Sequence, residues 1–525
     1  MIRDGKIWIA NTESGEPVYL LPKMANRHGL IAGATGTGKT ITLKVLAETF
    51  SDMGVPVFLA DVKGDIAGLL EAGVDSEDMQ TRIKKFGLEE AGFNYHKYPV
   101  TLWDVFGKNG IQVRTSISDM GPLLLGRILG LNDTQKDILT IVFKIADENG
   151  WFLYDTKDLK AMLNEVAENN KEYAAEYGNI AKQSIGAIQR AVVALEMEGG
   201  EQFFGQPALD VRDWFTTDSS GKGMIHILDS QSLINNGTLY STFLLWMLSE
   251  LFETMPEVGD LDKPKMVFFF DEAHLLFKDT PKALLDKIEQ VVKLIRSKGI
   301  GVYFVTQNPR DIPDGVLAQL GNKVQHALHA YTPSDQKAVK AAADSFRENP
   351  AFKTADVIEA LGTGEAVASF LQEDGTPAVV EKIFVLPPQS KMGGIDASVR
   401  DNAIKSSNFY SKYATAVDPD SAYEMLTREH DRKEQEEANA KEEAQAAKAA
   451  AKEQATAEKA EAREKEKEAN RKKRAAKSVG TTVAGTVGRE VGKKLGKQLG
   501  GKFGQTLGGN TGAQLFRGIL NTLIK

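Results

Sequence analysis

The 525-residue chain contains no cysteine. That absence excludes disulfide bridges, thiolate-ligated zinc sites and cysteine nucleophiles. The first ten residues contain no apolar run of signal-peptide length. The most apolar helix-like stretch, residues 241–255, is too short and too acidic to span a bilayer. These absences favour a soluble cytoplasmic protein, and the length predicts several domains or one elaborated domain with a tail.

Negative charge is scarce at the C-terminal end. Residues 471–525 hold 12 Lys and Arg against a single Glu, a net charge of +11. The other 470 residues carry −19, and the whole chain carries −8. The acidic body argues against inferring nucleic-acid binding from composition, and the basic end is considered separately.

Short apolar runs alternate with helical patterns over residues 1–395. The runs predicted as strands are 28–33, 55–61, 223–229, 265–272, 301–307, 322–329 and 365–370. Several are apolar throughout, as parallel strands buried on both faces are. The alternation predicts an α/β domain with a mostly parallel sheet and helices on both faces. A helical insertion is expected over about 116–215, where no convincing strand interrupts the helical periodicity.

After residue 395 the composition changes. Residues 396–422 are predicted to be a connector. Residues 423–477 consist almost entirely of Ala, Glu, Lys, Gln and Arg, which are strong helix formers, and Glu–Lys pairs four residues apart add support. Because Leu, Ile and Val are missing from core positions, we expect a solvated helical spacer and not a tight coiled coil.

Residues 478–525 form a basic tail with a glycine ladder, in which glycine recurs at every fourth position from 488 to 512. Small residues four apart allow close helix packing and self-association. The interleaved lysines suit peripheral binding to an anionic membrane surface. So many glycines also fit a disordered tail, and the three interpretations stay open.

The segment GATGTGKT, residues 33–40, matches G-x-x-x-x-G-K-[ST] between an apolar strand and a helical pattern. Glycines let backbone N–H groups converge on a phosphate, and the helix adds its positive N-terminal end. A lysine can contact the β- and γ-phosphates, and a threonine hydroxyl can bind Mg²⁺. The predicted nucleotide-binding residues are Gly33, Ala34, Thr35, Gly36, Thr37, Gly38, Lys39, Thr40 and Ile41.

A second part of the site is expected where the apolar strand in KMVFFFDEAHLLF ends. Asp271 would hold Mg²⁺ together with Thr40, and Glu272 would orient and activate the attacking water. The adjacent Glu272 favours hydrolysis over binding alone. The letters DEAH also occur in DEAH-box RNA helicases, but no second arginine-bearing lobe motif follows residue 307, so we treat that match as coincidental.

Two further residues complete the predicted catalytic set. The apolar strand in GVYFVTQNP ends at Gln307, where a polar side chain could reach the γ-phosphate. Arg296 stands eleven residues earlier, at the end of the preceding helix. It is either a solvent-facing helical residue or an arginine that completes a neighbouring subunit's site.

Together these motifs resemble the HerA/FtsK superfamily of P-loop translocases over about residues 1–395. The shared pattern is a P-loop, an apolar strand ending in Asp-Glu, and Arg-x-x-Gly leading into a strand that ends in Thr-Gln. The resemblance looks closest to a bacterial branch of HerA-like ATPases. It implies a RecA-like fold, ATP with Mg²⁺, and a ring, usually a hexamer, that moves double-stranded DNA.

The chain also departs from that family. Only 27 residues precede the P-loop strand, enough for a short hairpin but not for the small β-barrel with which HerA-type proteins often begin. DVKGD, residues 61–65, stands where relatives carry a D-P-x-G-E/D stretch. A nucleotide-switched scaffold that docks through its tail therefore stays an alternative to a DNA motor, whereas Glu272 disfavours a small-molecule kinase.

Overall fold

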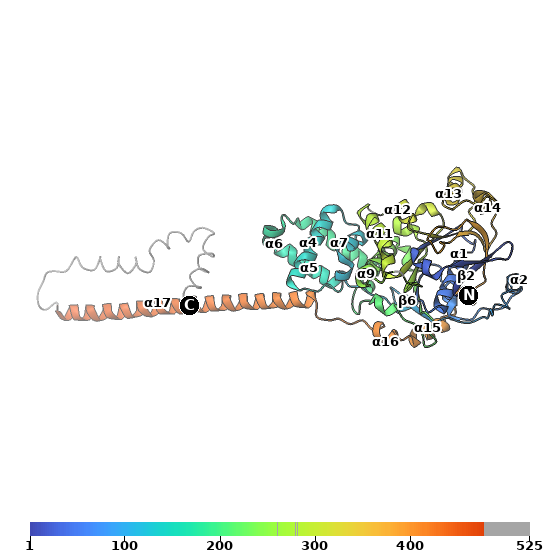
Figure 1. Cartoon of the computed structure of the whole chain (residues 1–525). Coiled ribbons are helices and arrows are strands. Elements are labelled where there is room, and N and C mark those ends of the chain that lie inside the picture. The colour runs from blue at the N-terminus through green and yellow to red at the C-terminus, as the bar shows by residue number, and fades with distance from the viewer. Residues whose placement is uncertain (260, 279, 281, 477–525) are drawn as a thin grey trace. The chain divides into compact units, whose positions relative to one another are not determined.

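The computed structural model describes residues 1–476 except 260, 279 and 281 (Figure 1), and the chain divides into two compact units. The first unit spans Met1–His430 and the second begins at Asp431. The glycine ladder and the rest of the basic tail lie outside the described residues. None of the described helices is both long enough and apolar enough to cross a membrane.

The strands of the described residues form one large sheet in the order β1-β2-β13-β12-β11-β4-β10-β9-β5-β8-β6-β7, with β3 paired to β2. From β11 to β7 every neighbouring pair is parallel, and the pairs from β1 to β12 and between β11 and β12 are antiparallel. The predicted α/β fold with a mostly parallel sheet is confirmed. The strands are β1 (Ile2–Arg3), β2 (Lys6–Thr12), β3 (Pro17–Leu20), β4 (Gly29–Ala32), β5 (Val57–Asp61), β6 (Val100–Asp104), β7 (Ile111–Gln112), β8 (Ile225–Asp229), β9 (Met266–Phe270), β10 (Ile300–Thr306), β11 (Asn322–Gln325), β12 (Glu365–Ser369) and β13 (Glu381–Val385).

Four of these strands, β1, β6, β7 and β13, were not singled out by the sequence. Strand β7 has only two residues, and β13 alternates charged and apolar residues in EKIFV at the antiparallel side of the sheet. Strands β2 and β3 form the short N-terminal hairpin that the sequence allows.

Both faces of the parallel strands are buried, which explains their continuous apolar runs. Along β9, Phe268 and Phe270 belong to one hydrophobic cluster and Val267 and Phe269 to the other. Helix α1 packs in the second cluster, whereas α3, α9 and α11 pack in the first. The sheet is therefore the middle layer of a three-layer α/β sandwich.

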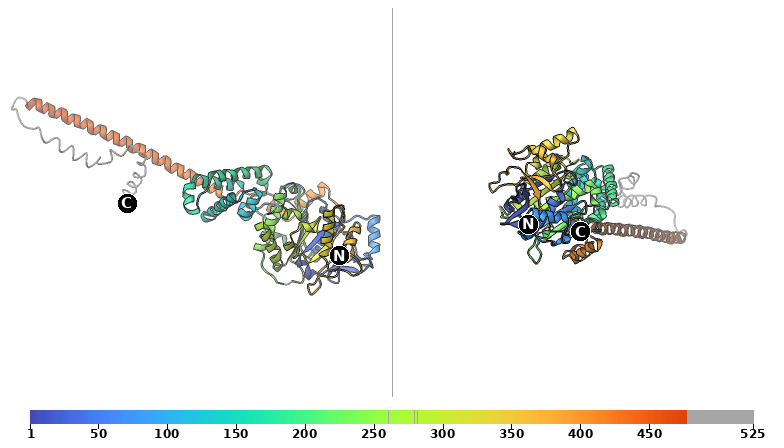
Figure 2. Two further views of the ribbon diagram at one scale, coloured as in Figure 1. Left: turned by 90° about the horizontal axis from the view of Figure 1, so that it is seen from above. Right: turned by 90° about the vertical axis from the view of Figure 1, so that its right-hand side faces the viewer.

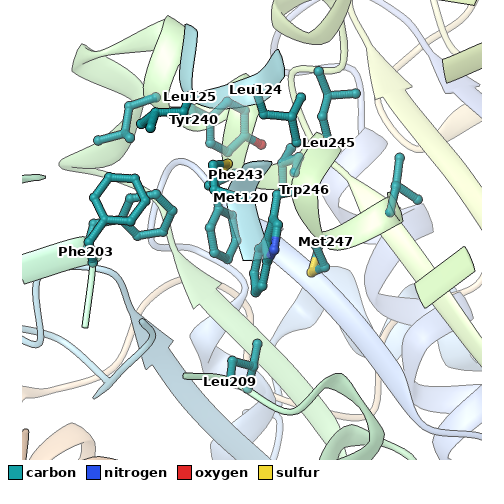
Figure 3. Close-up of a cluster of buried hydrophobic side chains, with 14 of the residues drawn as sticks. Met120, Leu124, Leu125, Phe203, Leu209, Tyr240, Phe243, Leu245, Trp246 and Met247 are labelled. Carbon is teal, nitrogen blue, oxygen red and sulfur yellow. The ribbon is translucent and has the colours of Figure 1, made fainter. Parts of the chain in front are cut away.

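The helices of the first unit are α1 (Lys39–Asp52), α2 (Glu77–Lys85), α3 (Ile117–Ile128), α4 (Asp133–Asn149), α5 (Thr156–Glu168), α6 (Asn170–Tyr177), α7 (Lys182–Met197), α8 (Gly200–Phe203), α9 (Gly237–Thr254), α10 (His274–Phe277), α11 (Lys282–Ile295), α12 (Asp314–Leu317), α13 (Pro333–Asp344), α14 (Thr354–Ala360), α15 (Ala397–Ser406) and α16 (Tyr410–Tyr413). Helices α3–α8 occupy the predicted helical insertion, and Figure 2 shows the α4–α7 group beside the sheet. Met120, Leu124 and Leu125 of α3 pack against Tyr240, Phe243 and Trp246 of α9, which joins this insertion to the sheet (Figure 3).

The first unit continues past residue 395, where the sequence predicted a connector. Helices α15 and α16 pack against the sheet, and Tyr413 is fully buried with its ring 5.6 Å from that of Trp103. Leu426, in the first turns of α17 (Ala422–Ala476), is also buried in this cluster. The Pro- and Gly-containing segment at 387–394, whose first four residues are buried, is therefore not the end of the core.

Helix α17 covers 55 residues, the same stretch that was predicted as a helical spacer. Its described side chains from Asp431 onward are exposed, and i,i+4 ion pairs such as Lys465–Glu461, at 2.7 Å, support it. At 1.5 Å per residue such a helix is roughly 80 Å long.

Candidate functional site

The P-loop follows β4 and leads directly into α1. Gly33, Gly36 and Gly38 have φ angles of 151°, 79° and 113°, in the region that side chains rarely adopt. A Cβ at Gly33 would lie 2.5 Å from the Cβ of His326. The loop therefore needs glycine both for its backbone path and for close packing.

Lys39 points back into the loop that carries it. Its ammonium group donates to the carbonyl oxygens of Gly33, at 2.6 Å, and Ala34, at 2.9 Å. Burial, together with the nearby charge of Lys63, lowers the pKa of Lys39, whereas Asp271 and Glu272 act in the opposite direction. A phosphate placed in the loop would offer this cation a better partner than two neutral carbonyls.

His326, at the end of β11, holds the P-loop from the other side. Its Nδ1 lies 2.9 Å from the Glu365 carbonyl oxygen, which can only accept, so Nδ1 carries the hydrogen. Its Nε2 then accepts from the Thr42 hydroxyl of α1 at 2.8 Å. Burial lowers the pKa of His326 to about 4, so the ring is neutral at physiological pH. His326 was not among the predicted site residues.

Asp271 and Glu272 follow β9, as predicted. The carboxyl group of Asp271 accepts the Glu272 backbone N–H at 2.9 Å, and burial with the Glu272 charge raises its pKa to about 7. Glu272 has a φ of 48°, a left-handed conformation that is uncommon for a residue with a side chain. This sharp turn directs two consecutive carboxylates to the same edge of the sheet.

The Glu272 carboxylate lies between two polar side chains. Its Oε2 accepts from Gln307 Nε2 at 3.4 Å and lies 3.3 Å from His274 Nδ1. The hydrogen bond with His274 lowers the pKa of Glu272 and raises that of His274. His274 is the histidine of the DEAH letters; it was not among the predicted site residues.

Strand order explains why these groups meet. Strand β10 lies between β4 and β9, and its pairing of Thr306 with Ala32 puts Gln307 level with Gly33. Lys39, Asp271, Glu272 and Gln307 therefore gather at the carboxyl edge of three adjacent parallel strands, where α/β sheets bind ligands.

Arg296 lies at the opposite edge. It begins the single turn that precedes β10 (Arg296–Lys298), and its charge acts on His28, just before β4. The seven residues of β10 separate it from Gln307, which is about 20 Å at 3.3 Å per residue. Arg296 therefore does not reach the nucleotide loop of its own subunit.

The residues present fit a magnesium nucleotide. Thr40, at the start of α1, offers a hydroxyl oxygen and Asp271 a partly buried carboxylate, the oxygen ligands that Mg²⁺ prefers. Among the described residues the Asp271 carboxylate accepts one hydrogen bond, from the neighbouring backbone. A cation beside it would offset the burial of its charge.

Comparison with known proteins identifies the family of the chain. The profile of the family described as "Helicase HerA-like C-terminal" matches residues 6–510, most of the chain. The chain belongs to this HerA-like helicase family. The predicted resemblance to HerA/FtsK-type P-loop ATPases is confirmed by this match.

Named relatives are distant. The chain is 23% identical over 372 residues to the DNA double-strand break repair helicase HerA of Sulfolobus acidocaldarius, covering 70% of this chain and 66% of the relative, just under two thirds. It is 22% identical over 354 residues to a probable helicase of Methanocaldococcus jannaschii, covering 66% and 60%.

Solved structures give similar but weaker matches. VirB4 of Thermoanaerobacter pseudethanolicus is 17% identical, with a TM-score of 0.48, over 73% of this chain and 97% of that one. The bacterial conjugative coupling protein TrwB is 15% identical, also with a TM-score of 0.48, over 73% and 90%.

Proposed function

We propose that this HerA-like protein hydrolyses ATP with Mg²⁺ and uses the reaction to move double-stranded DNA through a ring of subunits. The observation that carries the hydrolytic part is the position of Glu272. Glu272 is 7% exposed, and its carboxylate lies beside Gln307 and close enough to Lys39 to act on the pKa of Lys39. A base placed beside a phosphate site can activate water.

The chain's own groups divide the reaction between them. The P-loop N–H groups and Lys39 hold the phosphates, while Thr40 and Asp271 hold the metal. Bound Mg²⁺ neutralises phosphate charge during the transfer. Glu272 accepts a proton from the attacking water, and its lowered pKa keeps the carboxylate ionised at neutral pH. Gln307 orients that carboxylate through its amide N–H.

The ring and its DNA substrate are supported by the family. The relative of Sulfolobus acidocaldarius is named as a DNA double-strand break repair helicase, and the HerA/FtsK resemblance implies hexamers with nucleotides between subunits. The same arrangement gives Arg296 a role, because a residue at the edge opposite its own P-loop can complete only a neighbour's site.

Mixing two inactive variants tests that role. Rings containing both Arg296→Ala and Glu272→Gln subunits, each with its own affinity tag, have sites where an intact Glu272 faces an intact Arg296. We expect tandem-purified mixed rings to recover part of the ATPase activity. Mixed rings as inactive as either parent variant would contradict action between subunits.

The whole proposal is tested by ATP turnover in Mg²⁺, with and without double-stranded DNA. We expect hydrolysis that DNA accelerates several-fold, and Lys39→Ala should remove it. Absence of hydrolysis in the parent protein would overturn the proposal. Hydrolysis that DNA leaves unchanged would instead favour the nucleotide-switched scaffold, for which the acidic body and basic tail argue.

A further inference from the structure

The turn after β5 brings a second lysine to the site. Strand β5 is the neighbour of β9 on the side away from the P-loop, and Leu59 pairs with Phe269. Two residues further along, Asp61 and Asp271 are level with each other. The DVKGD segment therefore begins beside the Asp271–Glu272 pair, and Lys63 follows in that turn.

This turn is held in one conformation by its first residue. Asp61 is 2% exposed, and its carboxylate accepts the backbone N–H groups of Lys63, Gly64 and Ile66 at 3.2, 2.7 and 3.0 Å. Gly64 has a φ of 76°, and a Cβ there would lie 2.6 Å from Gln231 Nε2. The backbone at Lys63 is therefore fixed while its side chain is exposed.

The charge of Lys63 acts on the three central groups of the site. It contributes to the lowered pKa of Lys39 and of Glu272 and opposes the rise in the pKa of Asp271. Lys63 forms no direct ion pair with any residue that the structure describes. The site thus has a lysine on the β4 side and another in the turn on the β5 side, and within the described residues the Lys39 ammonium group donates to two carbonyl oxygens.

We propose that Lys63 binds the terminal phosphate of the nucleotide held by its own P-loop, so that the site distinguishes ATP from ADP. A triphosphate that runs from the loop toward Glu272 places its last phosphate between the two lysines. A diphosphate ends short of Lys63. This inference rests on the proposed function and adds to it the group that reads the nucleotide state.

The turn after β6 supplies a matched control. Asp104 accepts the backbone N–H groups of Phe106, Lys108 and Asn109 at 2.9, 2.8 and 2.8 Å, and Lys108 is exposed like Lys63. Strand β8 separates β6 from β5, so this lysine lies away from the nucleotide. Lys63→Met and Lys108→Met therefore remove the same charge from the same kind of turn.

The test measures ATP and ADP dissociation constants in the full chain, with Glu272→Gln in every sample to prevent turnover. Lys63→Met should weaken ATP binding about ten-fold, the loss of one hydrogen bond to a charged group, and leave ADP binding within about two-fold. Lys63→Arg should keep most of the preference for ATP, and Lys108→Met all of it.

The outcomes separate this inference from the function on which it rests. If the parent chain hydrolyses ATP and Lys63→Met keeps the parent ratio of ATP to ADP affinity, or weakens both ligands equally, Lys63 does not bind the terminal phosphate. It then only neutralises the nearby carboxylates. A parent chain that binds no ATP would overturn both proposals.

Discussion

Four neighbouring parallel strands bring an aspartate to the same edge of the sheet. Asp61, Asp229 and Asp104 end β5, β8 and β6, and Asp271 directly follows β9. The first three carboxylates accept N–H groups of their own turns, three each for Asp61 and Asp104. Asp271 accepts one, from the next residue.

This difference in the number of N–H donors distinguishes aspartates that cap a turn from an aspartate that could bind a metal. A carboxylate surrounded by backbone N–H groups is already stabilised and fixes a turn. Asp271 accepts a single N–H and lies beside a second carboxylate, and its pKa is raised to about 7; burial raises the pKa of Asp61 to about 6 even with three N–H donors. The pKa alone therefore does not distinguish the two, whereas the small number of donors leaves the Asp271 oxygens available to a cation.

The largest effect is expected at Glu272, the second carboxylate beside Asp271. Glu272→Gln should lower ATP turnover by about 100- to 10,000-fold, the usual worth of a general base, while ATP affinity changes little. Steady-state hydrolysis and equilibrium binding measure the two effects. Asp229→Asn, at a neighbouring strand end, is the control and should keep the parent rate. Parent-like turnover in Glu272→Gln would show that another group activates the water.

The next largest effect is expected on the stability of the fold and not on ATP turnover. Asp104→Ala leaves three backbone N–H groups without their acceptor and should lower the free energy of unfolding by about 2–4 kcal/mol. Turnover per folded molecule should stay at the parent value. Denaturant unfolding followed by tryptophan fluorescence measures the loss. A stable but inactive variant would mean that Asp104 belongs to the site.

Asp271→Asn should raise the free energy of unfolding, whereas Asp104→Ala should lower it. Because burial and Glu272 raise the pKa of Asp271 to about 7, its ionisation costs the folded state stability once the pH exceeds the ordinary value near 4. Without metal, the amide should raise the free energy of unfolding by about 1–2 kcal/mol at pH 8, and by less at pH 5. Thermal unfolding in a chelator measures this. A destabilised variant at pH 8 would contradict the proposed cost.

Sequence reasoning found the parts of the site that local backbone chemistry dictates. The P-loop needs glycines and a helix start within eight residues, and the Asp-Glu pair follows an apolar strand, so both are visible in the letters alone. His326 and the turn that carries Lys63 lie at the site because β11 and β5 take particular places in the sheet, whereas His274 follows Glu272 by only two residues. Strand order and register depend on contacts between distant segments, which no local pattern specifies.

The sequence placed the end of the domain too early, near residue 395, for a similar reason. Residues 387–394 contain proline and glycine and look like the end of a domain, yet Tyr413 is buried against Trp103 of β6. A single large aromatic residue in an otherwise polar segment gives little periodic signal. The charged helix α17, by contrast, follows from intrinsic helix propensity and ion pairs, which are local properties.

The smallest expected effect compares two buried histidines, one in each half of the sheet. His226 of β8 accepts from Trp103 Nε1 at 3.1 Å and donates to the Trp214 carbonyl at 3.1 Å. Burial lowers the pKa of His226 to about 3 and that of His326 to about 4. Below pH 6.5 the unfolded chain therefore takes up protons that the folded chain does not, and stability falls with pH.

Each histidine should cost about 1 kcal/mol of unfolding free energy between pH 7.5 and 5.5. His226→Gln should remove its share of that slope and leave ATP affinity unchanged. His326→Gln should remove a similar share and also weaken ATP binding, because it loosens Thr42 and the loop at Gly33. Unfolding curves at both pH values, together with ATP titrations, separate the two. Equal nucleotide affinity in both variants would show that His326, like His226, serves only the core.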